Sequence, residues 1–153
     1  MTAEIAFYKY LVNPVIRGLL RSPLHGLVSG NIAILHFTGR KSGRALSTPL
    51  SYTREGDTVR LLSSQNTRWW HNFRGDDARV EIELAGERHH GAAHLLEGDS
   101  DALRNGVTRF LTLLPRDAKV YGIKLDNNKR PVPESLAAKA ADLILVEITL
   151  GDG

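Results

Sequence analysis

The chain has 153 residues, of which 42% are hydrophobic and 24% charged, as is typical of one globular domain with a hydrophobic core. Its 20 Lys and Arg against 17 Asp and Glu give a net charge of +3, which is too small to predict nucleic-acid binding without a basic face. Because the sequence contains no cysteine, disulfides, thiolate catalysis and cysteine-ligated metal centres are excluded.

The first thirty residues predict an interrupted helical arm. Ile5, Tyr8 and Leu11 recur at helical spacing, and Pro14 then breaks the run. The aromatic and basic side chains of the arm fit three roles: packing on the domain, covering a pocket as a lid, or touching a membrane surface. No apolar run reaches the roughly 20 residues of a membrane span, and the first residues lack the long apolar run that is typical of a secretion signal. We therefore expect a cytoplasmic protein, with peripheral membrane association through the arm as the alternative.

From residue 31 the apolar residues recur with a period of two, which predicts strands. Near the middle of the chain, Val80, Ile82 and Leu84 are predicted to face inward, with Glu81 and Glu83 outward. Glycine-containing turns at 55–57 and 85–87 predict two hairpins. The predicted strands cover residues 31–38, 45–52, 58–64, 79–84, 88–96 and 143–150.

An amphipathic helix follows the second hairpin. Asp99 or Ser100 is predicted to cap its N-terminus, and Pro115 ends it. Its apolar stripe contains Leu103, Val107, Phe110, Leu111 and Leu114. A short helix is predicted at 136–141, before the last strand.

The order of these elements predicts a mainly β fold with helices (α+β). An antiparallel barrel of about six strands is favoured, because closure removes exposed strand edges. We assign residues 1–30 to a helical arm and residues 31–153 to the barrel, in a single domain overall. The sequence does not decide between a monomer and a homodimer.

The turn between the first two strands is unusually basic. Arg40, Lys41 and Arg44 lie beside Ser42 and Gly43 in the sequence GRKSGR. Backbone N–H groups in a glycine-containing turn can form an anion-binding nest, to which cationic side chains add charge-assisted hydrogen bonds. The turn therefore suits a phosphate or a run of carboxylates. It lacks the spacing of a P-loop, and a solvated hairpin tip is the alternative.

The segment WWHNFR at 69–74 predicts one or two helical turns capped by Asn66 or Thr67. Adjacent residues on a helix point about 100° apart, so the two indoles of Trp69 and Trp70 are not expected to fill one core pocket. One indole would pack inward and the other would wall a site. Two partly buried core aromatics are the alternative.

The combination TGRKSGR, STPLSY and WWHNFR resembles the deazaflavin-dependent nitroreductase family, whose fold is the split β-barrel of flavin-binding oxidoreductases. The resemblance extends over most of the chain, from SPLHGLVSGN at 22–31 to the last strand. It implies a pocket for the 5-deazaflavin coenzyme F-420. The implied cofactor-binding residues are Arg40, Lys41, Ser42, Gly43 and Arg44 for the phosphate and acidic tail, the backbone of Thr48, Pro49 and Leu50 with Ser63 and Ser64 for the ring, and Trp69 and Asn72 for the pocket wall.

The activity implied by the resemblance is hydride transfer from reduced F-420 to a quinone, a nitroaromatic or a similar conjugated acceptor. The coenzyme carries the hydride, so no side chain need act as a nucleophile. Tyr52, Ser63 and Ser64 are potential proton donors, and none is assigned as catalytic. The N-terminal arm would cover the acceptor side.

One departure from the family leaves other ligands open. Residues 64–68 are shorter than the family segment and lack its glycine and its His-Pro pair. Relatives in the wider split-barrel group use FMN, haem or fatty acids. FMN is therefore the alternative cofactor, and a non-enzymatic carrier of a lipid or other anionic ligand is the alternative function.

Two further ligand classes are not expected. His90 and His94 share a face of a predicted strand, but their Cα atoms would lie roughly 13 Å apart, too far to bind one metal ion. Trp69 and Trp70 are not accompanied by a basic stripe of the kind that nucleic acid requires. The predicted partner is thus a small-molecule acceptor.

Overall fold

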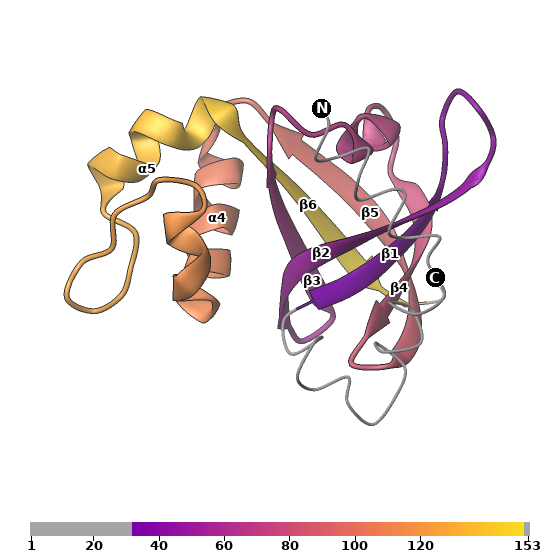
Figure 1. Cartoon of the computed structure of the whole chain (residues 1–153), viewed down its shortest axis with the longest axis horizontal. Coiled ribbons are helices and arrows are strands. Elements are labelled where there is room, and N and C mark those ends of the chain that lie inside the picture. Colours follow the sequence, from indigo (N-terminus) through magenta and orange to yellow (C-terminus); the bar gives the residue numbers. More distant parts are fainter. Residues whose placement is uncertain (1–31, 152–153) are drawn as a thin grey trace.

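The computed structural model describes residues 32–151, which fold into a closed antiparallel barrel with the two α-helices on one side (Figure 1). The strand order around the barrel is β1-β2-β3-β6-β5-β4, which confirms the expected barrel of six strands. The strands are β1 (Ile32–Thr38), β2 (Ala45–Glu55), β3 (Thr58–Ser64), β4 (Ala78–Leu84), β5 (Glu87–Glu97) and β6 (Leu143–Leu150). The helices are the 3-10 helices η1 (Trp69–Phe73), η2 (Pro115–Lys119) and η3 (Ala140–Asp142) and the α-helices α4 (Asp101–Leu113) and α5 (Pro133–Lys139). The predicted arm at 1–30, and its separation from the barrel, lie outside the described residues.

Both predicted hairpins form, with two-residue turns. Gly56 has a φ of 59° between β2 and β3, and Ala85 and Gly86 have φ of 50° and 84° between β4 and β5. Positive φ at the central residues matches the twist of the flanking strands, which is why short hairpins favour glycine there. The glycine signals therefore located these turns correctly.

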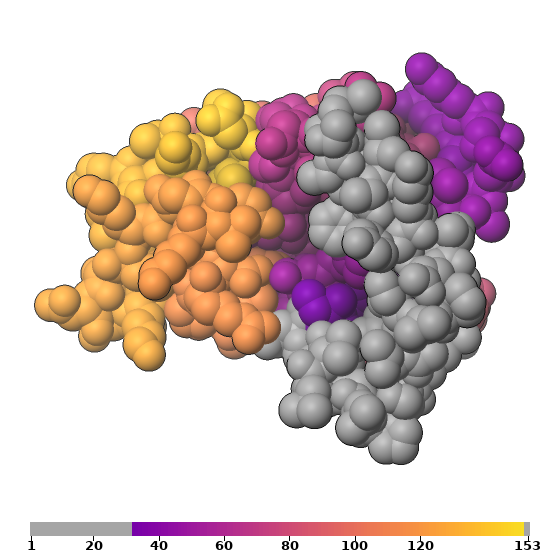
Figure 2. All heavy atoms as spheres, in the orientation of Figure 1, coloured from indigo at the N-terminus to yellow at the C-terminus, as the bar shows by residue number. Residues whose placement is uncertain are grey.

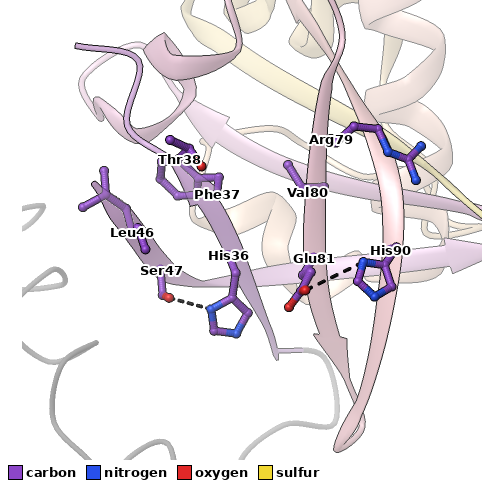
Figure 3. A pocket seen from close by; sticks show the side chains of 10 residues that line it. His36, Phe37, Thr38, Leu46, Ser47, Arg79, Val80, Glu81 and His90 are labelled. Atoms are coloured by element: carbon purple, nitrogen blue, oxygen red, sulfur yellow. Dashed lines mark hydrogen bonds and ion pairs between the residues drawn. The ribbon is translucent and has the colours of Figure 1, made fainter. Parts of the chain in front are cut away.

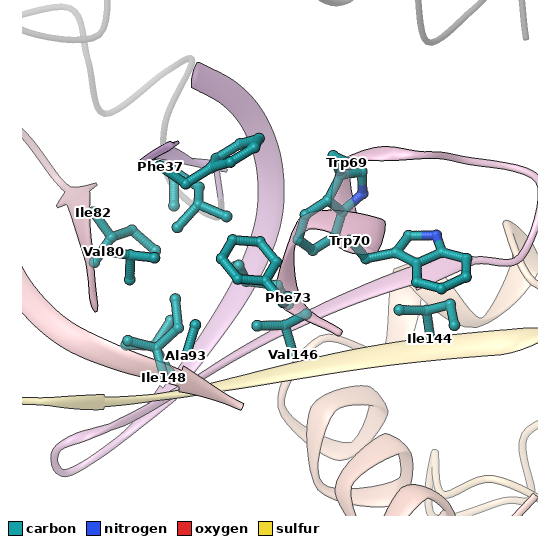
Figure 4. Close-up of a cluster of buried hydrophobic side chains, with 14 of the residues drawn as sticks. Phe37, Trp69, Trp70, Phe73, Val80, Ile82, Ala93, Ile144, Val146 and Ile148 are labelled. Carbon is teal, nitrogen blue, oxygen red and sulfur yellow. The ribbon is translucent and has the colours of Figure 1, made fainter. Parts of the chain in front are cut away.

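The barrel interior is filled by alternate residues of the strands (Figure 4). The predicted inward residues Val80, Ile82 and Leu84 are all buried in it. Its buried members are Ala33, Leu35, Phe37, Val59, Leu61, Trp69, Trp70, Phe73, Val80, Ile82, Leu84, Ala93, Ile144, Val146 and Ile148.

A second apolar cluster lies outside the barrel, where α4 covers β3 and β6. Ser100 caps α4, since its hydroxyl accepts a 3.1 Å hydrogen bond from the backbone N–H of Leu103. A Cβ built on Gly106 would lie only 2.2 Å from Leu145 Cδ2, so glycine lets the helix approach the strand closely. The cluster contains Leu62, Leu103, Val107, Phe110, Leu111, Leu114, Ala118, Ile123, Leu136, Ala140, Leu143 and Leu145.

Some predicted boundaries and caps were wrong. α5 begins at Pro133 rather than at residue 136, because proline is well suited to the first turn of a helix. η1 begins at Trp69 without a side-chain cap, and Thr67 instead donates a 2.8 Å hydrogen bond to the carbonyl of Ser64. Strand β2 continues to Glu55.

Glu83 points outward as predicted but is buried, with 4% of its surface exposed. Its carboxylate lies 3.2 Å from His36 Nε2 and 3.2 Å from an Arg88 nitrogen. These partners offset the cost of burying the charge of Glu83. The alternation of residues along a strand does not reveal them, because they come from other strands.

The ladder between β2 and β3 is short, and this opens the barrel wall on one side. The two strands pair only from Tyr52 with Leu61 to Glu55 with Thr58. Beyond Tyr52, the N-terminal half of β2 pairs with β1, while the end of β3 pairs with β6. Residues 45–51 of β2 therefore present a strand edge toward the end of β3. We call this opening the β2–β3 split.

Candidate functional site

The basic turn at residues 39–44 projects beyond the barrel (Figure 2). Gly39 N–H donates to the Arg44 carbonyl (2.8 Å) and Gly43 N–H to the Gly39 carbonyl (2.9 Å), so much of the backbone is satisfied within the turn. Arg44 N–H donates to the Ser42 hydroxyl. Anion binding by the turn thus depends less on a nest of free N–H groups than the sequence indicated. The exposed cationic side chains remain for that task.

Asn72 ties the basic turn to η1. Its Oδ1 accepts a 2.8 Å hydrogen bond from Arg40 N–H, and its Nδ2 donates to the Trp69 carbonyl at 2.9 Å. The indole Nε1 of Trp69 donates to the Ser63 hydroxyl at 3.3 Å, and that hydroxyl also bonds Thr67 at 2.8 Å. A chain of hydrogen bonds therefore connects the turn to the end of β3.

Both indoles are buried, which differs from the expectation that one would wall a site. Trp69 is 3% and Trp70 1% exposed, and both belong to the barrel core. They point in different directions, as expected, with Trp70 beside Ile144 (Figure 4). Helix η1 lies over the end of the barrel, so both directions lead into packed side chains. The structure therefore agrees with the alternative, in which both tryptophans are core aromatics.

The surroundings of η1 are positively charged. Desolvation lowers the pKa of His71, and the nearby charges of Arg74, Arg68 and Lys41 lower it further, against the opposing effect of Glu97. Arg74 also lies 4.9 Å from the Trp70 ring, in cation–π contact. The pKa of His71 is thus held below its ordinary value by burial first and by these cations second, and the cations leave the region suited to an anionic ligand.

Helix η2 and the residues after it bridge the β2–β3 split. The Asp117 side chain hydrogen-bonds Ser51 on β2, and burial raises the pKa of its carboxyl group. Tyr121 donates a 2.9 Å hydrogen bond to the Leu62 carbonyl on β3. Burial strongly raises the pKa of the Tyr121 hydroxyl, which therefore stays protonated and keeps donating. Side-chain hydrogen bonds from residues 117 and 121 thus connect the two edges of the split to one segment, in place of a strand ladder.

A cavity of about 580 Å³ lies beside the split, at the end of β3. Ser64, one of the predicted ring-contact residues, lines it. The sequence did not point to the lysines opposite, because they are far from the recognisable motifs. The lining residues are Ser64, Asn66, Lys119, Val120, Tyr121, Gly122, Lys139, Asp142 and Leu143.

A second cavity, of about 410 Å³, lies at the strands on the other side of the basic turn (Figure 3). His36 bonds the Ser47 hydroxyl at 2.6 Å, and His90 lies 3.8 Å from Glu81. No predicted cofactor-binding residue lines this cavity. Its lining residues are His36, Phe37, Thr38, Ala45, Leu46, Ser47, Arg79, Val80, Glu81 and His90.

Thr48, Pro49 and Leu50 lie on the edge of β2 that faces the split. Thr48 is buried, and the other two are half-buried. The structure thus arranges the predicted residues in three groups: the basic turn, the β2 edge, and the end of β3 with η1. Hydrogen bonds join the first group to the third.

No cluster of three or more metal-ligating side chains occurs within residues 32–151. His94 instead pairs with Asp77, with 2.8 Å between the nitrogen and the carboxylate oxygen. None of the helices within the described range has the length and apolarity to cross a membrane.

Several solved structures share the fold. A reductase dependent on F420-H2, FDR-A, is 16% identical with a TM-score of 0.50, covering 77% of this chain and 93% of its own. An FMN-binding protein related to pyridoxamine 5'-phosphate oxidase, from Nostoc punctiforme, is 14% identical with a TM-score of 0.52, covering 91% and 79%. A protein from Mycobacterium smegmatis that binds FAD and haem is 11% identical with a TM-score of 0.52, covering 93% and 68%. At these low sequence identities, the structural similarity shows a shared fold and nothing about function.

No curated protein is similar enough to match the chain. A family model described as F420H(2)-dependent quinone reductase matches residues 21–124, which include the basic turn, the β2 edge, η1 and Tyr121. This match covers more than half of the chain and agrees with the resemblance carried by its motifs. The chain therefore belongs to the family of F-420-dependent quinone reductases and is an oxidoreductase that uses this coenzyme.

Proposed function

We propose that F-420 lies along the β2–β3 split, with its acidic tail at the basic turn and its ring toward Ser64, and that the protein reduces a quinone there. The observation that carries this proposal is the short β2–β3 ladder, which ends at Tyr52 and Leu61. Within residues 32–151, it leaves the edge of β2 from residue 45 to residue 50 without a strand partner on that side, since Asp117 bonds only Ser51 across the split. The basic turn adjoins this edge at residue 45, and the Ser64 cavity lies at the end of β3.

The basic turn is suited to the phosphate and acidic tail. Arg40, Lys41 and Arg44 are exposed, and none has a carboxylate partner among residues 32–151. A Cβ built on Gly43 would meet no atom within 4 Å, so there is open space above the turn. Asn72 already fixes the backbone of the turn. An anion that binds the cations of a fixed turn therefore costs less conformational entropy than one that binds a flexible loop.

The β2 edge is suited to a planar ring. Thr48 and Leu50 can offer backbone hydrogen-bonding groups at an edge where no strand within residues 32–151 pairs, whereas Pro49 has no N–H to offer. The barrel core behind this edge, including Trp69, supports it from inside. In this proposal Trp69 acts by positioning Ser63 and the edge rather than by touching the ring.

The bound coenzyme would supply the hydride, and the chain would orient the reactants and exclude water. Of the three potential proton donors, Ser64 lines the cavity. Ser63 is engaged by Trp69 and Thr67. Tyr52 does not line this cavity, and burial raises the pKa of its hydroxyl. Ser64, whose hydroxyl donates to Asn66, is therefore the one of the three that lines the cavity, and the proton that completes the quinol comes from solvent.

Equilibrium binding tests the assignment. Oxidised F-420, FMN and haem are titrated separately into the full chain, with the absorbance of each cofactor as the signal. We expect F-420 to bind most tightly, and K41A and R44A each to weaken it by about three- to tenfold in a salt-dependent manner.

K124A is the matched control, because Lys124 is exposed and lines neither cavity. Equal losses in K41A and K124A would exclude a specific role for the basic turn. Binding of FMN but not F-420 would overturn the cofactor assignment for this site. A parallel titration with a fatty acid, followed by tryptophan fluorescence, would favour a carrier if the fatty acid alone binds.

A further inference from the structure

The cavity beside Ser64 has two lysines on its lining, contributed by different helices. Lys119 ends η2, and Lys139 ends α5. A Cβ built on Gly122 would lie 3.3 Å from Lys139 Cε and 3.6 Å from its Nζ, so this side chain lies across the Gly122 backbone. Glycine with a φ of 68° leaves the room that Lys139 occupies.

Neither ammonium group has an ion-pair partner within the part of the chain that the structure describes. One carboxylate, that of Asp142, also lines the cavity. The cavity therefore has a charge of +1 from its own ionised side chains. Its remaining walls include the exposed side chain of Val120 and the ring of Tyr121, which provide apolar surface for a ring.

Reduction of a quinone by hydride creates negative charge on oxygen. A hydride carries one proton and two electrons, so a neutral quinone that accepts it becomes a quinol monoanion, and a solvent proton then completes the quinol. Cations placed in advance beside the developing oxyanion lower the barrier, because they interact more strongly with the transition state than with the neutral substrate.

We infer that the Ser64 cavity is the acceptor pocket and that Lys119 and Lys139 stabilise the quinol anion formed in it. The inference rests on the proposed function, since the reductant is F-420 bound in the β2–β3 split. It predicts a preference by charge: acceptors that become anionic are favoured, and acceptors that begin as cations are disfavoured.

Steady-state reduction of two acceptors tests this preference. One is a neutral naphthoquinone, and the other is a cationic phenazinium dye, which becomes neutral when it accepts hydride. We expect the K119Q/K139Q double variant to lose on the order of tenfold in kcat/KM for the quinone, and to keep or increase kcat/KM for the dye. A merely structural effect would lower both values together, and this outcome would overturn the inference.

D142N provides a test of opposite sign at the same cavity. Removing its carboxylate should raise kcat/KM for the quinone and lower it for the dye. K124Q is the matched lysine control, and it should change neither value, because Lys124 does not line the cavity. Unchanged quinone kinetics in the double variant would also overturn the inference.

A binding measurement separates this inference from the proposed function. Calorimetric titration of 1-hydroxy-2-naphthoate, a non-reducible aromatic anion, into the protein with oxidised F-420 should give weaker binding in K119Q/K139Q. The affinity for F-420 should stay within twofold of that of the unmodified chain. Absence of F-420 binding in the unmodified chain would instead contradict the proposed function itself.

Discussion

The side chain of Asn72 accepts a 2.8 Å hydrogen bond from the backbone N–H of Arg40, across 32 positions of sequence. The same side chain donates to the Trp69 carbonyl, and the Trp69 indole donates to Ser63. One amide thus sets the position of the basic turn relative to the end of β3. These are the two places between which the proposed coenzyme site extends.

Replacement of Asn72 by alanine should therefore affect both stability and binding. We expect N72A to lose about 1 kcal/mol of unfolding free energy, because two hydrogen bonds are lost at a partly buried site. Its affinity for F-420 should fall about threefold or more, because the turn would no longer be fixed. Urea denaturation and F-420 titration measure the two effects. N127A, in an exposed loop, is the control, and equal changes in both variants would contradict the tether.

The hydroxyl of Tyr121 should matter for stability more than that of Tyr52. Y121F removes the donor to the Leu62 carbonyl at a strand edge, which leaves that carbonyl unsatisfied. We expect a loss of about 1–2 kcal/mol in unfolding free energy from chemical denaturation. Y52F is the matched control, because no hydrogen bond of the Tyr52 hydroxyl exists within residues 32–151. A loss in Y52F as large as in Y121F would show that the bridge across the split adds nothing.

Asp117 should give the fold a measurable pH dependence. Burial raises the pKa of its carboxyl group above 3.8, so the folded state holds the proton more tightly than the unfolded state does. Its contribution to stability is fully present below pH 3.8 and is lost as the pH rises through the folded pKa.

D117N removes this titration and keeps a side chain that can bond Ser51. The unfolding free energy of D117N relative to the unmodified chain should therefore increase as the pH rises from below 3.8 toward neutrality, because only the unmodified chain loses stability as its buried carboxyl group ionises. Thermal unfolding across this range is the measurement. A difference that is constant with pH would refute the assignment of the shift to Asp117.

Gly106 should be intolerant of even one methyl group. The Cβ of G106A would lie 2.2 Å from Leu145 Cδ2, so α4 must move away from β6 or the leucine must leave its rotamer. Such overpacking costs about 1–3 kcal/mol, which outweighs the gain of up to about 1 kcal/mol in helix propensity.

The clash with Leu145 can be isolated by a double-mutant cycle. The same G106A change in an L145V background should cost less, because the shorter side chain leaves room. Chemical denaturation of the four proteins gives the coupling energy. Independent, additive effects of the two changes would mean that the helix, rather than the contact, is disturbed.

Local sequence determined the strands and turns of this protein. A period of two places Val80, Ile82 and Leu84 on one face whatever the rest of the fold does, and positive φ at Gly56 and Gly86 requires little beyond the turn itself. The cap at Ser100 is equally local, since donor and acceptor are three residues apart.

Only the tertiary structure decided how the candidate site is assembled. Burial of both Trp69 and Trp70 depends on η1 covering the barrel end, and the burial of Glu83 depends on partners from other strands. Lys119 and Lys139 meet at one cavity because α4 places η2 against the split and β6 brings the end of α5 there. The physical reason is that periodicity and turn chemistry act over a few residues. Contacts between distant segments, by contrast, are set by barrel closure and by where its ladders end.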